Sequence, residues 1–339
     1  MTRRRLLRAV VCGVTCCALT GCGGTPAGPT RPPAAHETSP GPAGSSAGSS
    51  ARSAGPVSAR ASIAGWRLAQ PSARQALVDL GGGRVMLAGG MLPGDTSTNA
   101  VRRIDLRTGR SSQLAPLLVP VHDAAGGRFD GAPAVFGGGN ATEQALVQAI
   151  RGASWRRVAA FPTTRSDLSV VSTPYGTVAL GGYDGTSTPR TVFVQRPGQR
   201  LRPAGQLVRG VRYAATAYVA GAVYVFGGEV SGAELRTVQR VDPRTGSARV
   251  VATLPRPLGH AMAVGIGGRA LILGGHVGAV ARTDRMWWFD PATRRFTPAG
   301  RLPRPVSDAA VASDGTSVWL LGGEDPGVTD RVVRVDLRR

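Results

Sequence analysis

The sequence predicts an all-β protein with the architecture of a six-bladed β-propeller, and two observations lead to this prediction. A short apolar strand that runs into a glycine pair occurs six times, at 85–90, 134–138, 177–182, 223–228, 270–275 and 318–323. The first glycines of these pairs are separated by 44 to 48 residues. A nearly fixed period of this size is typical of one supersecondary unit copied around an array.

Within each repeat, the glycine pair ends the second of four expected strands. The continuous apolar run is typical of a strand buried on both faces, and the glycines permit a sharp turn close to another backbone segment. A third strand ends in a turn rich in Asp, Pro, Thr and Gly, as in 103–109, 240–246 and 288–293. A fourth strand and a proline-rich connection follow. Four strands in each of six units predict a propeller.

This pattern resembles the kelch repeat. The shared features are the glycine pair, the Asp turn and a tryptophan in some fourth strands, Trp66 and Trp155, and the resemblance covers residues 63–339. Blades two and three lack the Asp turn, and four of the fourth strands lack the tryptophan. The resemblance implies a kelch-type propeller of the galactose-oxidase-like superfamily, and it implies little about function.

The two ends of the repeat array predict how the ring closes. A full fourth strand follows Asp290, whereas only three residues follow Asp336, so the sixth blade is one strand short. The segment 63–68 precedes the first repeat and contains Trp66. We expect it to supply the missing strand, which would leave no long unpaired edge between the first and last blades. The alternative is that this segment is disordered.

The chain carries a formal net charge of +21, and all 41 of its basic residues are arginine. A charge of this sign attracts anionic surfaces. The arginines are spread over every blade and do not form a basic stripe interleaved with aromatic residues, so nucleic acid is not an expected partner. Anionic lipid or a cell-wall polymer fits better, and an ordinary solvated surface is the alternative.

The N-terminal residues 1–21 have the features of a signal peptide: a basic start, a short apolar stretch and small residues before Cys22. The segment 19–22 (LTGC) resembles the bacterial lipobox, which implies a fatty-acyl (palmitate-type) lipid on Cys22. A conventional signal peptide that contains a cysteine is the alternative. The segment 2–7 (TRRRLL) also resembles a twin-arginine motif, so both Sec and twin-arginine export stay open.

The remaining domain boundaries follow from composition. Residues 22–62 comprise the candidate lipidated cysteine and a Gly/Pro/Ala/Ser-rich segment that we expect to be a disordered tether. Residues 63–339 form the expected propeller, which contains no cysteine and therefore no disulfide. Together these features predict an extracytoplasmic protein that is anchored to the cell membrane through lipid. We expect it to be a monomer.

A candidate ligand rim is predicted at one end of the central channel. Fourteen residues before each first glycine stands a polar or amphipathic residue, where the innermost strand should begin. Because the second strand returns antiparallel, the residues after the glycine pairs reach the same face. The predicted rim contains Gln75, Asp123, Asp167, Tyr213, His260, Asp308, Glu229, His276 and Glu324, with Arg74 and Arg212 beside them.

Two interpretations of this rim are open. It is either a structural feature around a water-filled channel, or a site for a sugar or a cation. Carboxylate oxygens are suitable ligands for Ca²⁺ or Mg²⁺, and the histidines would also allow a transition metal to bind. No local ligand-spacing motif supports a metal, so we expect no cofactor and leave a divalent cation at the channel mouth as an alternative.

The expected function is binding: a scaffold lipoprotein that recognises a protein or a glycan through one propeller face. The alternative is a sugar-modifying enzyme with its site at the channel mouth, because sialic-acid mutarotases are similar six-bladed kelch rings. The radical copper oxidases of this superfamily require a cysteine crosslinked to tyrosine, and residues 23–339 contain no cysteine. Hydrolase and phosphate-binding motifs are also missing from the sequence.

Overall fold

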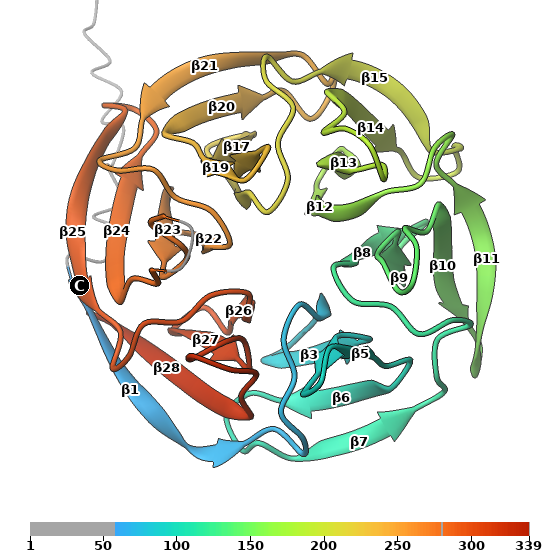
Figure 1. Cartoon of the computed structure of the whole chain (residues 1–339), viewed down its shortest axis with the longest axis horizontal. Helices are drawn as coiled ribbons and strands as arrows, with labels where there is room; N and C mark the ends of the chain where they lie inside the picture. Colours follow the sequence, from blue (N-terminus) through green and yellow to red (C-terminus); the bar gives the residue numbers. More distant parts are fainter. Residues whose placement is uncertain (1–57, 279–280, 339) are drawn as a thin grey trace, which may run out of the picture. The chain divides into compact units, whose positions relative to one another are not determined.

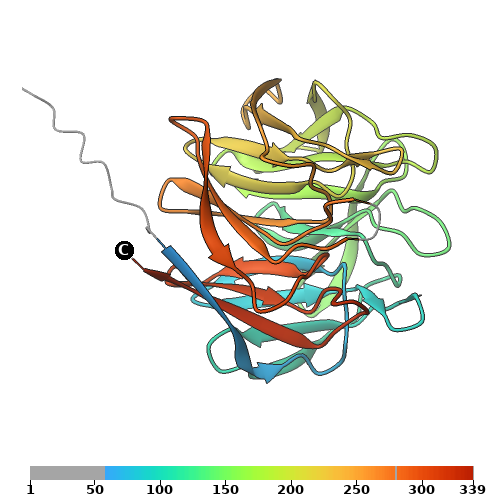
Figure 2. The same ribbon diagram turned by 60° about the vertical axis from the view of Figure 1, so that its left-hand side comes forward.

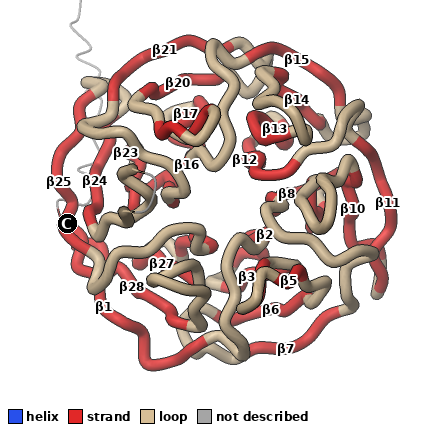
Figure 3. The backbone as a smooth tube through the Cα atoms, viewed as in Figure 1, coloured by secondary structure: helices blue, strands red, loops and turns tan. Residues whose placement is uncertain are grey.

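The computed structural model describes residues 58–278 and 281–338, and these residues form a ring of six four-stranded antiparallel sheets around a central axis (Figure 1). Every regular element in this part of the chain is a β-strand (Figure 3). The all-β, six-bladed propeller predicted from the repeat is therefore confirmed. Among the described residues, no helix is long and apolar enough to span a membrane. The candidate leader, Cys22 and most of the expected tether lie outside the described residues.

The first three blades follow the expected order from the axis outward. Blade one contains β2 (Ala76–Gly81), β3 (Arg84–Ala88), β6 (Val101–Asp105) and β7 (Ser111–Leu114), with the short hairpin β4 (Met91–Leu92) and β5 (Thr96–Ser97). Blade two contains β8 (Ala125–Phe129), β9 (Ala132–Phe136), β10 (Leu146–Arg151) and β11 (Ser154–Ala160). Blade three contains β12 (Ser166–Thr173), β13 (Gly176–Tyr183), β14 (Thr191–Gln195) and β15 (Arg202–Gln206).

The last three blades repeat this order, except that blade six takes a strand from the other end of the chain. Blade four contains β16 (Ala215–Val219), β17 (Ala222–Phe226), β20 (Thr237–Val241) and β21 (Ala248–Thr253), with the short hairpin β18 (Glu229–Val230) and β19 (Ala233–Glu234). Blade five contains β22 (Met262–Ile266), β23 (Arg269–Leu273), β24 (Arg285–Asp290) and β25 (Arg295–Arg301). Blade six contains β26 (Ala310–Ser313), β27 (Ser317–Leu321), β28 (Arg331–Arg338) and β1 (Ser58–Arg67).

The closure predicted from the ends of the array is confirmed, because β1 pairs antiparallel with β28 at the outside of blade six (Figure 2). The pairing runs from Ser58 opposite Arg338 to Ile63 opposite Val333. The strand thus begins at Ser58, five residues inside the segment expected to be tether. The side chains of 58–62 are small except for the exposed Arg60, which is compatible with an outer strand, and the end of β28 supplies their backbone partners.

The hydrophobic core is divided among the six boundaries between blades. Each second strand is buried on both sides, as the apolar runs predict; all five residues of β17 are buried. Six clusters of buried residues occur in the described part of the chain, and each joins two neighbouring blades. One of them packs Trp288 of blade five against Val318 and Val335 of blade six. Burial between blades therefore holds the ring together.

The glycine pairs join each blade to the connection that follows it. In blade two, the N–H of Gly138 donates a 2.9 Å hydrogen bond to the carbonyl of Arg165, in the connection to blade three. A Cβ atom on Gly137, whose φ is +58°, would lie 2.1 Å from that carbonyl oxygen. Only glycine combines this conformation with so close a backbone approach. The repeated pair is thus explained by the fold and is no phosphate-binding loop.

Candidate functional site

Six residues, one from each blade, form a closed ring of backbone hydrogen bonds at the start of the innermost strands. Each N–H donates to the carbonyl of the preceding member around the ring, at 2.9–3.1 Å, and the last bond runs from Arg74 back to Asp308. All six have φ between +52° and +57°, a conformation uncommon for residues other than glycine. We call this set the inner ring: Arg74, Asp123, Asp167, Tyr213, His260 and Asp308.

Five members of the inner ring are the residues predicted from the repeat, but in blade one the prediction was wrong by one position. Arg74 occupies the place assigned to Gln75. The hairpin between β2 and β3 contains a bulge, with a register shift between Asp79 and Gly81, so counting back from the glycine pair ends one residue too late. Gln75 is instead buried beside the glycines, and its side-chain amide donates to the Ser72 hydroxyl.

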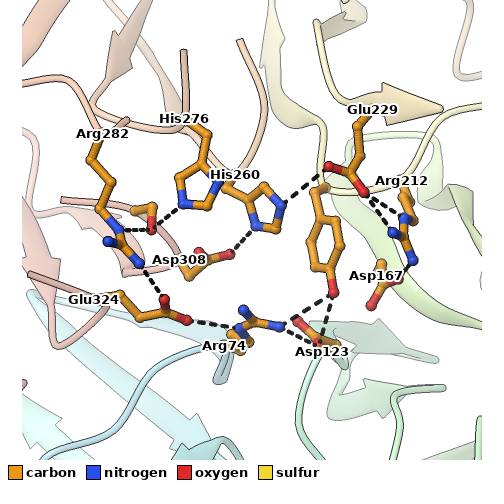
Figure 4. A network of polar contacts seen from close by, with 12 residues as sticks. Arg74, Asp123, Asp167, Arg212, Glu229, His260, His276, Arg282, Asp308 and Glu324 are labelled. Atoms are coloured by element: carbon orange, nitrogen blue, oxygen red, sulfur yellow. Dashed lines mark hydrogen bonds and ion pairs between the residues drawn. The ribbon is translucent and has the colours of Figure 1, made fainter. Parts of the chain in front are cut away.

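The residues after the glycine pairs lie at the same end of the channel, as predicted from the antiparallel return. Their backbones form isolated antiparallel β-bridges: Glu229 with Arg212, His276 with Gly259 and Glu324 with Ser307. Each of these partners directly precedes an inner-ring residue. In blades four to six, side chains from two successive turns therefore point toward the axis, where they join the inner-ring side chains of the other blades in one polar network (Figure 4).

Arginines from three blades neutralise the carboxylates of this network. Arg74 forms ion pairs with Asp123 (3.2 Å) and Glu324 (3.0 Å). Arg212 pairs with Glu229 (2.6 Å) and lies 3.5 Å from Asp167. Arg282, which the sequence reasoning missed, donates to Glu324 at 2.6 Å. It comes from the loop after the fifth glycine pair, and because these loops differ in length, no periodic position reveals it.

His260 lies at the centre of the network between two carboxylates. Its Nδ1 is 2.8 Å from Asp308 and its Nε2 is 3.6 Å from Glu229. The ring stacks between Tyr213 and His276, with centroid separations of 3.8 and 4.3 Å. Burial alone would lower the pKa of His260, but its hydrogen bonds to Asp308 and Glu229 outweigh burial and raise the pKa to about 9. His260 is therefore a cation at neutral pH.

The five carboxylates of the network differ in their affinity for protons. Burial raises the pKa of Asp123 to about 6 and that of Asp167 to about 7, against the lowering effect of Arg74 and Arg212 respectively. Burial would also raise the pKa of Asp308, but the hydrogen bond from His260 and its positive charge keep that pKa below the usual value. Asp308 thus stays ionised, whereas burial shifts Asp167 toward its protonated form.

Contacts across the axis fill the channel mouth. Arg74 of blade one reaches Tyr213 of the opposite blade, with 3.3 Å between Nη1 and the phenol oxygen, which lies 3.4 Å from Asp123. The side chains of the five carboxylates are only 4–10% exposed. We call the network the polar plug: Arg74, Asp123, Asp167, Arg212, Tyr213, Glu229, His260, His276, Arg282, Asp308 and Glu324.

Beneath the polar plug, the central channel has a volume of about 600 Å³. Small and aliphatic side chains of the innermost strands line it along their whole length, among them Ala124, Ala214 and Ala261 near the plug. At the far ends of these strands, Asp79, Arg128 and Tyr218 line it. The carboxylates of the plug are not part of this lining.

One trio of the plug has the spacing of a metal site. Ligand atoms of His260, His276 and Asp308 all lie within 4.8 Å of one another. However, both ring nitrogens of His260 face carboxylates and its raised pKa keeps it protonated. A metal would have to displace that proton, so the trio fits a hydrogen-bonded cation better than a metal centre.

Comparison with known proteins agrees with this geometry. A model of the Kelch motif matches residues 211–255, which contain all four strands of blade four. The fold is a kelch-repeat β-propeller. Kelch-like protein 35 of Mus musculus is 28% identical to the kelch propeller described here over 174 residues, which are 51% of this chain and 29% of the relative. The aligned part is thus under a third of that relative's length.

Proposed function

We propose that this kelch propeller is an extracytoplasmic, lipid-anchored scaffold that binds a protein or a glycan. The observation that carries the proposal is the internal pairing of the polar plug. Its arginines and His260 neutralise its buried carboxylates, and its side chains meet across the axis. An acid–base catalyst needs a group that faces a substrate. A plug whose charges are engaged with one another favours a rigid binding platform.

The binding surface that we propose is the loop face, the end of the ring that carries the loops after the glycine pairs and the connections between blades. Leu118 and Val208 are 50% and 45% exposed, and they occupy equivalent positions in two of these connections. Apolar side chains that are exposed on loops lose their contact with water when a protein partner covers them, which favours binding. The Kelch motif and the mouse relative support a protein-interaction scaffold.

Substitutions on the loop face provide the test of this scaffold function. Leu118→Asp with Val208→Asp should reduce binding to a partner or glycan at least tenfold, because two apolar side chains are replaced by charges that the interface would have to desolvate. Val250→Asp is the matched control, because Val250 is 50% exposed on the outer strand β21. Binding would be measured with the full chain on a glycan array and by crosslinking to envelope proteins. Equal losses in both variants would contradict a role for the loop face.

The lipid anchor is tested separately at Cys22. The Cys22→Ala variant should lose incorporation of a fatty-acid analogue and should be released from the membrane fraction, because export without acyl chains provides no stable hold on a bilayer. Metabolic labelling and fractionation measure both effects. Label that persists in the variant would exclude Cys22 as the lipidation site.

A sugar-modifying enzyme is the second candidate, and one observation favours it. The pKa of Asp167 is raised to about 7, which is suited to proton transfer at neutral pH. On this alternative, free sugars should show faster anomeric exchange by NMR when the protein is present, and Asp167→Asn should abolish the acceleration. Exchange at the uncatalysed rate across a panel of free sugars would leave the scaffold as the better account.

A further inference from the structure

The two ends of the propeller differ in charge. We call the end opposite the loop face the hairpin face, because it carries the turns that join the third and fourth strands. Each blade places an exposed arginine in or beside this turn, or at the corresponding end of β28 in blade six. These six arginines are Arg110, Arg151, Arg200, Arg244, Arg294 and Arg338.

Arginines on the two faces also differ in their partners. On the loop face, Arg282 pairs with Glu324, Arg301 with Asp284 and Arg304 with Asp325. Among the six hairpin-face arginines, Arg151 alone has an ion-pair partner in the described part of the chain, Asp130 at 3.9 Å.

The hairpin face also carries acidic residues, and seven lie there in the described part of the chain: Asp79, Asp105, Asp130, Asp242, Asp290, Asp314 and Asp336. They are fewer than the arginines, because six more arginines lie at this end besides those named above: Arg84, Arg107, Arg128, Arg196, Arg269 and Arg295. Asp105, Asp242 and Asp290 begin three of the turns, and each accepts backbone N–H bonds there at 2.8–2.9 Å. Their carboxylates are thus used to shape the turns. The hairpin face therefore presents an excess of positive charge to the solvent.

The chain enters the propeller on this same face. Ser58, the first residue of β1, pairs with Arg338 at the hairpin end of β28, and β1 then runs toward the loop face. Residues 1–57, which include Cys22, are therefore joined to the ring at the hairpin face. A lipid on Cys22 would connect to the ring from the side that carries the excess of arginine.

We propose that the hairpin face docks on anionic phospholipid headgroups of the bilayer that holds the anchor. This inference rests on the proposed lipidation of Cys22, which keeps the face close to the bilayer. Guanidinium groups bind phosphate with paired hydrogen bonds. A basic residue near an anionic membrane strengthens binding about fivefold at physiological ionic strength, and the effect decays within a Debye length. Docking in this orientation leaves the loop face directed away from the membrane.

A flotation assay on vesicles separates the face from the anchor. The full chain carrying Cys22→Ala should float with phosphatidylcholine vesicles that contain phosphatidylglycerol more than with phosphatidylcholine alone, and added salt should weaken the difference. Arg200→Gln with Arg294→Gln should lower the anionic-vesicle partition coefficient roughly twentyfold. The matched control is Arg209→Gln with Arg256→Gln, which removes the same charge from exposed positions on the loop face, and it should change partition less than about twofold.

The outcomes distinguish this inference from the proposed function. If the wild-type chain floats with neutral vesicles and the Cys22→Ala variant does not, that flotation is due to the lipid anchor alone. Equal effects of the two arginine pairs on anionic vesicles would overturn the docking inference while leaving the anchor intact. A second outcome would also overturn the docking inference: the protein binds a soluble polyglycerol phosphate through Arg200 and Arg294 but shows no preference for anionic vesicles. The ligand of the hairpin face would then be a cell-wall-type polymer.

Discussion

Deletion of residues 23–70 is expected to unfold or aggregate the protein, whereas deletion of 23–57 should change its melting temperature little. The longer deletion removes β1, which pairs with β28 along its length and closes blade six. Its loss exposes the edge of β28 and removes the contacts of Trp66 with Trp319 of the last blade and Gly109 of the first. An unpaired edge of this kind is a template for aggregation. The shorter deletion leaves every strand of the described ring in place.

A point substitution tests the same closure with the backbone intact. The Trp66 ring packs 6.0 Å from that of Trp319, between centroids, and lies against Gly109 of blade one. Trp66→Ala should lower the free energy of unfolding by about 2–3 kcal/mol, because the side chain is only half-buried. Thermal unfolding followed by circular dichroism measures all three proteins. Equal melting temperatures for the two deletions would refute closure by the N-terminal strand.

The second large effect is expected at Asp308. The Asp308→Asn variant should lose about 3 kcal/mol at pH 7, because the buried His260 cation would lose its closest counter-charge, now 2.8 Å away. Asp167→Asn is the internal control. The pKa of Asp167 is already raised to about 7, so a neutral amide should change stability by about 1 kcal/mol or less. Urea unfolding of both variants at pH 7 measures the difference.

The pH dependence of stability follows from the same groups. The pKa of His260 rises from 6.5 to about 9 on folding, so its stabilisation is complete below pH 6.5 and is lost as the pH rises through 9. The raised pKa values of Asp123 and Asp167 act in the same direction between about pH 4 and 7, because the native state there binds more protons than the unfolded chain. Stability should therefore fall from mildly acidic pH toward pH 9.

This pH profile has its own control. His260→Gln should flatten the decline between pH 7 and 9, where His260 is the titrating group. A wild-type protein that becomes more stable over that range would contradict a protonated His260. Similar losses of unfolding free energy in Asp308→Asn and Asp167→Asn would contradict an ionised Asp308 that stabilises the His260 cation.

Much of the architecture could be read from the sequence, because it depends on local patterns that recur with a period. The glycine pairs follow from a backbone approach that only glycine tolerates, and Trp66 before the first repeat identified the closing strand. Five inner-ring positions followed from the same spacing. Gln75 was assigned wrongly because one bulged residue in the hairpin between β2 and β3 moves Arg74 into its place. A count along the chain does not detect such a bulge.

The state of the polar plug was decided by the tertiary structure. Composition and spacing placed carboxylates at the channel mouth, but whether they repel one another or pair depends on side chains that arrive from other blades. Arg282 comes from an aperiodic loop, and Arg74 meets Tyr213 from the opposite side of the ring. The charge of His260 depends on two carboxylates on different blades. The periodic sequence determines the backbone path and the burial of each strand. The pKa values of the polar plug depend instead on distances between side chains across the ring, and these distances are fixed only when all six blades close.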